Sequence, residues 1–414
     1  MQAEKLPPQT FRRVRPPYRA VKRRPVTVPR RVKTKNIKAI LSQLKYKNIF
    51  ILVAVLMTVS WVIMLPFRGR PVSETLIPTP EFSVSPTLIP PYVPPAPEPD
   101  IEDLGFAYNV RRQPYQRYNS QLQEIVDELV NIAEEKGLPT GPLSISLIDV
   151  SNQDIHTFAG YQGQVLRYPA SVSKLFWMAA FYGAVEEGLI DDESKFHGDL
   201  RSMMQKSHND SASKILDAIT DSKSGVKLEG EKLNTWLEKR KSVNEFFHKA
   251  GYQGLIVSTK NYPRYSPSQT GPVGRDRQLR KENGKFLRNL ISTDHASRLM
   301  YEIYTRQAVS PKFSTRMAYL LTRDLTPEVW QNDPYNGVKG FLAESLPPSS
   351  VYFGSKVGFT SKHRMDVAFV RTLDDRAIYI LAIFAEDAAY ATDEEIFPKL
   401  SRHVYDRMMA MGRK

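Results

Sequence analysis

Apolar residues are concentrated in one uninterrupted stretch near the start of the chain. The twenty residues from Asn48 to Phe67, NIFILVAVLMTVSWVIMLPF, include no charged side chain. A helix rises about 1.5 Å per residue, so this stretch could cross the roughly 30 Å hydrocarbon core of a bilayer. A buried core helix is the alternative, but a soluble helix of this length normally has a polar face. We therefore expect residues 48–67 to form a transmembrane helix.

From residue 104 onward the hydrophobic pattern is typical of a folded domain. Tyr118–Lys136 has the apolar spacing of an amphipathic helix, and Leu143–Val150 alternates like a strand that can pair with Ile155–Tyr161 in a hairpin. Ser171–Leu189 is apolar on nearly every side, which predicts a helix buried at the centre of the domain. The remaining pattern predicts helices near 199–206, 210–220, 232–250, 293–307, 310–323 and 399–411, and strands at 350–355, 365–372 and 377–385.

The order of these elements indicates the fold class. Strands lie at both ends of the domain and helices lie between them, so one antiparallel sheet is expected to form from the N- and C-terminal strands. The terminal helices would cover one face of this sheet, and an all-helical subdomain at about 171–348 would be inserted between the strands. The predicted fold is therefore α+β with three layers, and not a series of βαβ units.

The formal charge of +14 is confined to the first 47 residues. This segment has 15 Lys and Arg and one acidic residue, Glu4, whereas the rest of the chain has 43 basic and 43 acidic residues. Nucleic acid is therefore not expected as a partner of the folded part, although the tail itself could bind it. Residues 1–47 are interrupted by Pro and lack helical periodicity, which predicts a disordered tail. Dense basic charge before an apolar span keeps such a tail in the cytoplasm, where it could contact anionic lipid.

Residues 68–103 connect the apolar stretch to the folded domain. Ten of the 30 Pro of the chain lie between residues 71 and 100, and a Pro-rich segment of this kind is extended and semi-rigid. A ligand for Pro-binding modules is one interpretation, but a plain stalk is simpler. We expect this linker to hold residues 104–414 outside the cytoplasm, next to a single-pass membrane anchor.

The composition excludes several kinds of chemistry. The chain has no Cys, which rules out disulfides, thiolate metal sites and a cysteine nucleophile. Its seven His show no paired spacing suited to a metal ion, and no Gly-x-Gly-x-x-Gly or phosphate-loop motif is present. We therefore expect neither a metal nor a cofactor.

Ser171-Val172-Ser173-Lys174 is a candidate nucleophile and base. The pattern Ser-x-x-Lys also occurs at Ser42, Ser211 and Ser224, so the spacing alone does not identify a catalytic site. Ser171 differs because it begins the apolar helix, where its hydroxyl would lie near unpaired backbone N–H groups. Lys174 would lie on the same face, and apolar surroundings would lower its pKa enough for a neutral amine to take the Ser171 proton. An N-cap serine followed by a surface lysine is the alternative.

Two further motifs follow in order along the chain. Ser207-His208-Asn209 lies between two predicted helices, and Lys356-Val357-Gly358-Phe359-Thr360 follows the strand-like run 351–355. With Ser-x-x-Lys on a buried helix, these motifs make the chain resemble the penicillin-recognising serine acyl-transferases, and most closely the class A β-lactamases. The resemblance covers roughly residues 117–412.

The resemblance implies roles for individual residues. Ser171 would be the acylated nucleophile, Lys174 its general base, and Ser207 a proton relay toward the leaving nitrogen. Asn209 would hold a substrate amide, and Lys356 would support the electrostatics around Ser207 and a substrate carboxylate.

The resemblance also assigns the third motif to substrate binding. The backbone N–H groups of Ser171 and Phe359 would form an oxyanion hole, with Gly358 and Thr360 beside the substrate. Arg364 matches a place where class A enzymes often have a carboxylate-binding Arg, although a surface Arg is an equally good interpretation.

Three departures from the family pattern stand out. His208 replaces the usual Asp and should mainly shape its loop. Val357 replaces a Thr or Ser, so the hydroxyl for the substrate carboxylate is missing unless Thr360 or Ser355 compensates. The glutamate that activates the deacylating water in class A enzymes is also missing, because Asn261-Tyr262-Pro263 includes no acid. Glu282 is a weak candidate for that base, in a stretch (256–290) that we expect to be a long surface loop.

Three functions remain open at this point. The first is a β-lactamase-like hydrolase anchored in a bacterial inner membrane, with its catalytic domain in the periplasm. The second is a penicillin-binding peptidase that acts on D-Ala-D-Ala ends of peptidoglycan, which slow deacylation would favour. The third is an inactive relative that binds cell-wall peptides.

Overall fold

A computed structural model describes residues 106–281, 284 and 286–412 of the chain. These residues belong to one compact unit, Pro80–Lys414. The predicted basic tail, the apolar stretch 48–67, the linker and Glu282 lie outside the described residues. Within the described part, no helix has both the length and the apolar character needed to cross a membrane.

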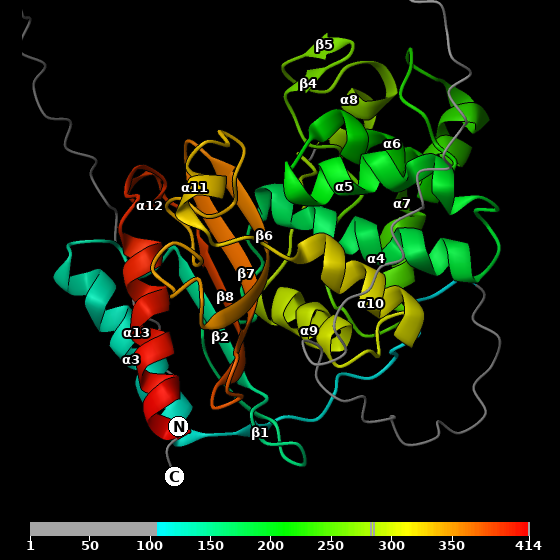
Figure 1. The fold of residues 1–414 in the computed structure, drawn as a ribbon. Helices are drawn as coiled ribbons and strands as arrows, with labels where there is room; N and C mark the ends of the chain where they lie inside the picture. Colours follow the sequence, from blue (N-terminus) through cyan, green and yellow to red (C-terminus); the bar gives the residue numbers. More distant parts are fainter. Residues whose placement is uncertain (1–105, 282–283, 285, 413–414) are drawn as a thin grey trace, which may run out of the picture. The chain divides into compact units, whose positions relative to one another are not determined.

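A six-stranded sheet forms the centre of the domain (Figure 1). Its strand order is β1-β3-β2-β8-β7-β6, and all neighbours are antiparallel except β1 and β3. The sheet joins strands from both ends of the domain, as the sequence predicted. The strands are β1 (Arg117–Tyr118), β2 (Leu143–Asp149), β3 (Thr157–Tyr161), β6 (Val351–Thr360), β7 (His363–Thr372) and β8 (Ile378–Ala385).

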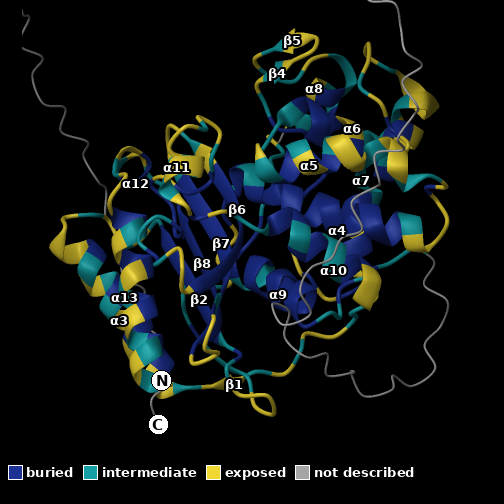
Figure 2. Ribbon diagram, viewed as in Figure 1, coloured by how far each residue is buried: buried dark blue, intermediate teal, exposed yellow. Residues whose placement is uncertain are grey.

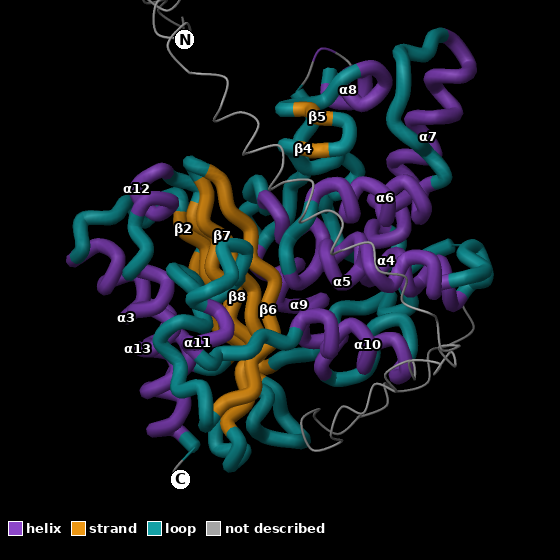
Figure 3. The backbone as a smooth tube through the Cα atoms, turned by 45° about the horizontal axis from the view of Figure 1, so that its top comes forward, coloured by secondary structure: helices purple, strands orange, loops and turns teal. Residues whose placement is uncertain are grey.

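Helices cover both faces of this sheet, which gives three layers (Figure 3). α3 (Ser120–Glu135) and α13 (Ile396–Met411) pack on one face, and α9 (Thr293–Tyr304) packs on the other. Successive residues of a strand point to opposite faces, so Leu147 enters the core under α3 while Ile148 enters the core on the α9 side. The predicted α+β fold with three layers is therefore confirmed.

The segment between β3 and β6 is the predicted insertion, but it is not all-helical, because Arg264–Tyr265 and Ser268–Gln269 pair as a two-stranded sheet within it. Its α4 is buried at every residue from Ser173 to Ala184, which confirms the expectation of a central buried helix (Figure 2). Trp177 fixes α4 by donating a 2.6 Å hydrogen bond to the Val257 carbonyl. The insertion includes η2 (Ala170–Val172), α4 (Ser173–Glu186), η3 (Glu193–Phe196), α5 (His197–Gln205), α6 (Asn209–Thr220), α7 (Gly230–His248), β4 (Arg264–Tyr265), β5 (Ser268–Gln269), α8 (Gly274–Arg280), α9, α10 (Pro311–Leu321) and α11 (Pro327–Trp330).

Three details differ from the sequence-based expectation. The two serines of β2, Ser144 and Ser146, are buried instead of facing water, and Ser146 donates a 2.6 Å hydrogen bond to Asp294. β6 continues through the third motif to Thr360, because β7 pairs with it over that whole length. The stretch 256–290 is not a surface loop throughout: residues 257–261 are buried, and β4, β5 and α8 follow.

Candidate active site

A cleft of about 970 Å³ lies where five segments of the chain meet. These segments are η2, the turn before α6, the 261–265 loop, the 334–341 loop and the end of β6. All three motifs found in the sequence contribute residues to its walls. The cleft therefore combines helices of the insertion with a strand from the C-terminal part of the sheet.

Ser171 lies in η2, directly before α4. The preceding Ala170 has a φ of 46°, in the left-handed region that a residue with a side chain rarely adopts. Asn261 stabilises this turn, since its Nδ2 donates to the Ala170 carbonyl at 3.1 Å and to Ser173 Oγ at 3.0 Å. The serine is thus held at the cleft by a local conformation that the surroundings enforce.

Lys174 is fully buried, with its amine next to Ser171. Its Nζ lies 2.9 Å from Ser171 Oγ and 2.7 Å from Asn209 Oδ1, and it also contacts the Ser207 carbonyl. Burial lowers the pKa of Lys174 to about 7, because the charged ammonium loses its water and has no carboxylate among these partners. A large fraction of the amine is therefore neutral at physiological pH and able to accept a proton.

Ser207 lies between two lysines. Its hydroxyl is 3.3 Å from Lys174 Nζ and 3.0 Å from Lys356 Nζ, and its φ of 55° is again in the left-handed region. The pKa of Lys356 falls well below its usual value, first through burial and then through the nearby Lys174 and Arg323 charges. The Ser207 hydroxyl is thus placed to pass a proton between neighbouring groups.

The register of β6 directs backbone N–H groups toward Ser171. The carbonyls of Phe353 and Ser355 accept hydrogen bonds from Arg323, on the side away from β7. Because backbone groups alternate in direction along an antiparallel strand, Phe359 also turns its N–H away from β7, toward the open edge. A Cβ on Gly358 would meet the Pro169 carbonyl at 2.4 Å and Ser171 N at 3.1 Å, so only glycine allows this close approach. The Ser171 N–H therefore lies next to the part of β6 that carries the Phe359 N–H, as the predicted oxyanion hole requires.

Asn209 is engaged within the protein at both ends of its amide. Its Oδ1 accepts from Lys174 and its Nδ2 donates to the Pro263 carbonyl at 2.8 Å. His208 behaves as the sequence analysis expected, because its ring accepts from Ser211 N and caps α6. Its ring also stacks on Tyr265 across the cleft wall, with centroids 6.2 Å apart.

The structure does not support a carboxylate-binding role for Arg364, nor the alternative of a surface Arg. Arg364 is only 3% exposed, although it lines the cleft. Its Nε, Nη1 and Nη2 each donate to a backbone carbonyl, of Tyr390, Gly340 and Ala391. These bonds use the guanidinium to hold α12 (Ala388–Thr392) and the 340 turn against β7.

The proposed compensation for Val357 is also limited by geometry. Ser355 is buried and lies outside the cleft lining. Thr360 lines the cleft, but its Oγ1 already pairs with His363 Nδ1 at 2.6 Å and accepts from Lys362 N.

Carboxylates are scarce around Ser171. Among the described residues that line the cleft, Glu394 is the one acid, and it pairs with Lys339 at 3.0 Å. Tyr262 lines the cleft where an acid was sought, and its hydroxyl is buried without a hydrogen-bond partner. The described residues also include no group of three or more His, Asp or Glu arranged to hold a metal ion.

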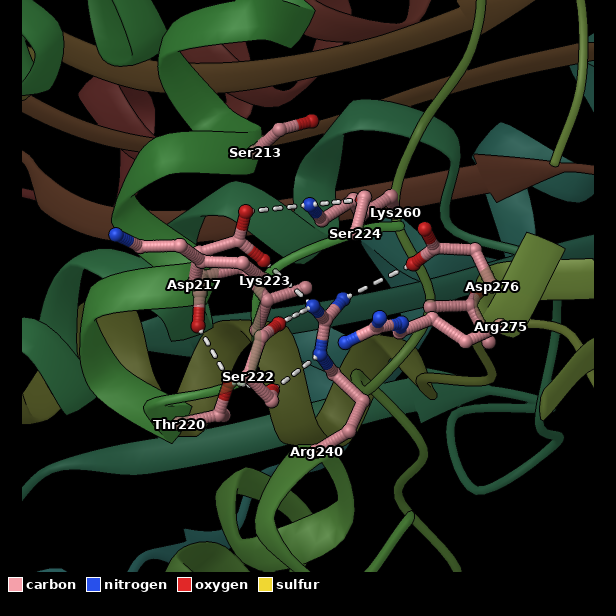
Figure 4. Close-up of polar contacts among 12 residues, drawn as sticks. Ser213, Asp217, Thr220, Ser222, Lys223, Ser224, Arg240, Lys260, Arg275 and Asp276 are labelled. Atoms are coloured by element: carbon pink, nitrogen blue, oxygen red, sulfur yellow. Dashed lines mark hydrogen bonds and ion pairs between the residues drawn. The ribbon is translucent and has the colours of Figure 1, made fainter. Parts of the chain in front are cut away.

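A buried ionic network supports the loop that carries Asn261 (Figure 4). Asp217 on α6 accepts from Arg240 Nη2 at 2.5 Å and from Lys260 Nζ at 2.6 Å. Arg240 also reaches Asp276 of α8 at 3.4 Å. Arg240 belongs to a Lys-Arg-Lys run (239–241), a pattern that by charge alone indicates a solvated face, but its side chain is fully buried. Sequence reasoning missed this network and the role of Asn261.

Comparison with known proteins identifies the family. Residues 121–408 match the model of the β-lactamase enzyme family. Among solved structures, PBP-A is 16% identical, with 73% of this chain and 100% of that chain covered and a TM-score of 0.48. The β-lactamase from Sphaerobacter thermophilus DSM 20745 is 16% identical, with 69% and 97% covered and a TM-score of 0.44. A β-lactamase from Burkholderia vietnamiensis is 13% identical, with 70% and 97% covered and a TM-score of 0.46.

No curated protein sequence matches the chain. The solved structures are too distant to carry an argument, but the family model covers well over half of the 414 residues. The protein therefore belongs to the β-lactamase enzyme family and is a serine hydrolase of the β-lactamase type.

Proposed function

We propose that the protein opens the amide of β-lactams by forming an acyl-Ser171 enzyme, and that it releases the acyl group slowly. The observation that carries this proposal is the buried Lys174 amine, with its pKa near 7, 2.9 Å from Ser171 Oγ. A neutral amine at this distance is a suitable general base for a serine hydroxyl.

The acylation step follows from these positions. Lys174 Nζ takes the proton of Ser171 as its Oγ bonds to the carbonyl carbon, and the N–H groups of Ser171 and Phe359 stabilise the oxyanion. The proton then moves through the Ser207 hydroxyl to the leaving nitrogen, and the carbon–nitrogen bond breaks. The product is an ester on Ser171 and a free amine, with no net change in protons.

Hydrolysis of that ester needs a base that activates water. In the described cleft lining the one acid, Glu394, is paired with Lys339, so among the described residues at the site the amine of Lys174 is the base that remains for this step. We therefore expect a long-lived acyl-enzyme.

The same observation favours a second candidate, a penicillin-binding peptidase that acts on D-Ala-D-Ala ends of peptidoglycan. Such an enzyme needs acylation by a peptide amide but does not need fast hydrolysis of β-lactams. Release of D-Ala from a synthetic peptide with this terminus would favour the peptidase.

The test is the intact mass of the purified full-length protein over time after addition of benzylpenicillin. A persistent adduct supports the proposal, and an adduct that disappears within minutes indicates efficient hydrolysis. No adduct supports the third possibility, an inactive relative.

Two variants identify the reacting groups. Ser171→Ala should abolish the adduct and Lys174→Ala should slow it by at least about 10²-fold. Lys214→Ala is the matched control, because Lys214 ends another Ser-x-x-Lys but is exposed and pairs with Asp199. Adduct formation on Ser171→Ala at the wild-type rate would contradict the site assignment.

We also propose, from the sequence, that residues 48–67 anchor the protein in a bacterial inner membrane with residues 104–414 in the periplasm. Deleting residues 1–67 should release the protein from the membrane fraction. Added protease should digest residues 104–414 of the intact protein in cells with an opened outer membrane. Protection of these residues would contradict the proposed topology.

A further inference from the structure

The cleft wall built by β6 is apolar. Val357, Phe341 and Phe359 all line the cleft, and Phe359 is 52% exposed. The rings of Phe341 and Phe359 lie 6.4 Å apart at an interplanar angle of 85°. An exposed aromatic ring beside a nucleophile offers a contact surface to an apolar group of the substrate.

The polar groups on this wall already have partners. Lys356 Nζ lies 3.0 Å from Ser207 Oγ and 2.7 Å from the Val357 carbonyl, and its side chain is fully buried. Thr360 Oγ1 is engaged by His363 and Lys362 N. Neither group is free to compensate the charge of a substrate carboxylate.

The cation of Arg364 is similarly occupied. All three of its side-chain nitrogens donate to backbone carbonyls. Its guanidinium also lies 5.2 Å from the centroid of each of the rings of Phe341 and Phe359. Both rings therefore lie next to a cation that is already engaged by the backbone.

An acid lies behind the same wall. Asp366 is the cross-strand partner of Val357, and its carboxyl is buried with Oδ1 lacking a hydrogen-bond partner. Burial raises the pKa of Asp366 to about 7, so part of it is ionised at neutral pH. The neighbouring Arg323 and Lys356 charges favour this ionised form, and the negative charge of Asp366 itself offers no attraction to a substrate carboxylate.

We propose that the β6 wall binds an uncharged, apolar group of the substrate and that Val357 sets this preference. The substrate class is then amides and esters whose group against this wall is neutral, because a carboxylate there would lose its water without gaining a donor. This inference rests on the proposed function, since it concerns the same acyl-transfer site.

Benzylpenicillin and its methyl ester test the preference. The two probes share the reacting amide and differ in one negative charge. The adduct rate of the purified full-length protein, measured by intact mass, should be at least about tenfold higher for the ester. A higher rate for the free acid would overturn the inference.

Val357→Thr tests the residue itself. A hydroxyl on the cleft wall could donate to a carboxylate, and a hydrogen bond to a charged group should raise the acid-to-ester rate ratio by about ten- to a hundred-fold. Val351→Thr is the matched control, because Val351 lies on the same face of β6 with 8% exposure, against 9% for Val357, and is outside the cleft. Its rate ratio should equal that of the wild type.

An unchanged ratio in Val357→Thr would refute the assignment to Val357. If this variant does not fold, the wild-type comparison still decides whether the wall prefers a neutral group. Failure of the proposed function has a different signature: neither probe would form an adduct that depends on Ser171. An adduct that forms faster with the acid would leave the function standing and remove only this inference.

Discussion

Replacing Asp217 by Asn should strongly destabilise the domain. Asp217 is the shared partner of Arg240 and Lys260, whose side chains are both fully buried. The amide of Asn keeps the shape but removes the charge, which leaves Lys260 with a weaker acceptor and leaves Arg240 with Asp276, at 3.4 Å, as its remaining carboxylate. Breaking a buried ion pair in this way costs about 3–5 kcal/mol. For a domain of this size the entropy of unfolding is roughly 0.6 kcal/mol per kelvin, so such a loss corresponds to a decrease in Tm of about 5–8 °C.

Asp221→Asn is the control for this prediction. Asp221 and Lys239 are close in sequence to Asp217 and Arg240, and they pair at 2.6 Å. The side chains of Asp221 and Lys239 are 86% and 49% exposed. An exposed pair of this kind contributes about 0–1 kcal/mol, so its Tm should change little. Differential scanning calorimetry of the purified full-length variants at equal concentration measures both values.

The pH dependence gives the reasoning a second check. Arg240 cannot lose its proton, but the pKa of Lys260 is already lowered to about 8, first by burial and then by the Arg240 charge. Asp217 counteracts this shift, so its loss should lower the pKa of Lys260 further. The unfolded state then binds more protons than the folded state between that pKa and about 10.5, and stability rises with pH there. The Tm deficit of Asp217→Asn should therefore be smaller at pH 9 than at pH 6. Equal Tm losses for Asp217→Asn and Asp221→Asn would refute the assignment.

Three further predictions concern the reaction. The acylation rate should rise with pH through about 7, as Lys174 loses its proton, and a pH-rate profile with no inflection between 6 and 8 would argue against this base. Gly358→Ala should slow acylation by about 10²-fold and have a smaller effect on Tm, because its Cβ would push the Pro169 carbonyl, and with it η2, away from β6. A stopped-flow acylation rate equal to that of the wild type would contradict the close contact. Tyr262→Glu introduces a carboxyl on a residue that lines the cleft and whose hydroxyl makes no hydrogen bond, so the adduct should decay about 10²-fold faster in the mass time course. Tyr262→Gln should not reproduce this gain, and an unchanged decay rate in Tyr262→Glu would contradict the prediction.

Local patterns in the sequence were sufficient for much of the fold. The all-round apolar character of 171–189 predicted α4 because few helices other than a central one can bury every face. The strands at both ends predicted a sheet made from distant parts of the chain, and the three motifs predicted which residues would meet. Ser171, Lys174, Ser207, Asn209 and Lys356 do lie together.

The remaining parts of the site depend on contacts between residues far apart in sequence. A Lys-Arg-Lys run indicates a solvated face, yet Arg240 shares a helix face with Trp236, Val243 and Phe247, and that spacing could have placed it inside. No local pattern shows that Asn261 would reach the Ala170 carbonyl. Arg364 was expected either to bind a carboxylate or to lie on the surface, and its burial could not be predicted because its three acceptors belong to segments that its own neighbourhood does not reveal.

An unpaired strand at the border of a sheet normally invites self-association, since its free backbone groups can pair with another molecule. β6 occupies that border, but the Thr322–Gly354 bridge and the Arg323 hydrogen bonds cover its first half. Further along the strand, η2 lies against Gly358. The end of β6 can therefore offer backbone donors to a small ligand, while the covered first half of the strand is not free to pair with a strand of another molecule.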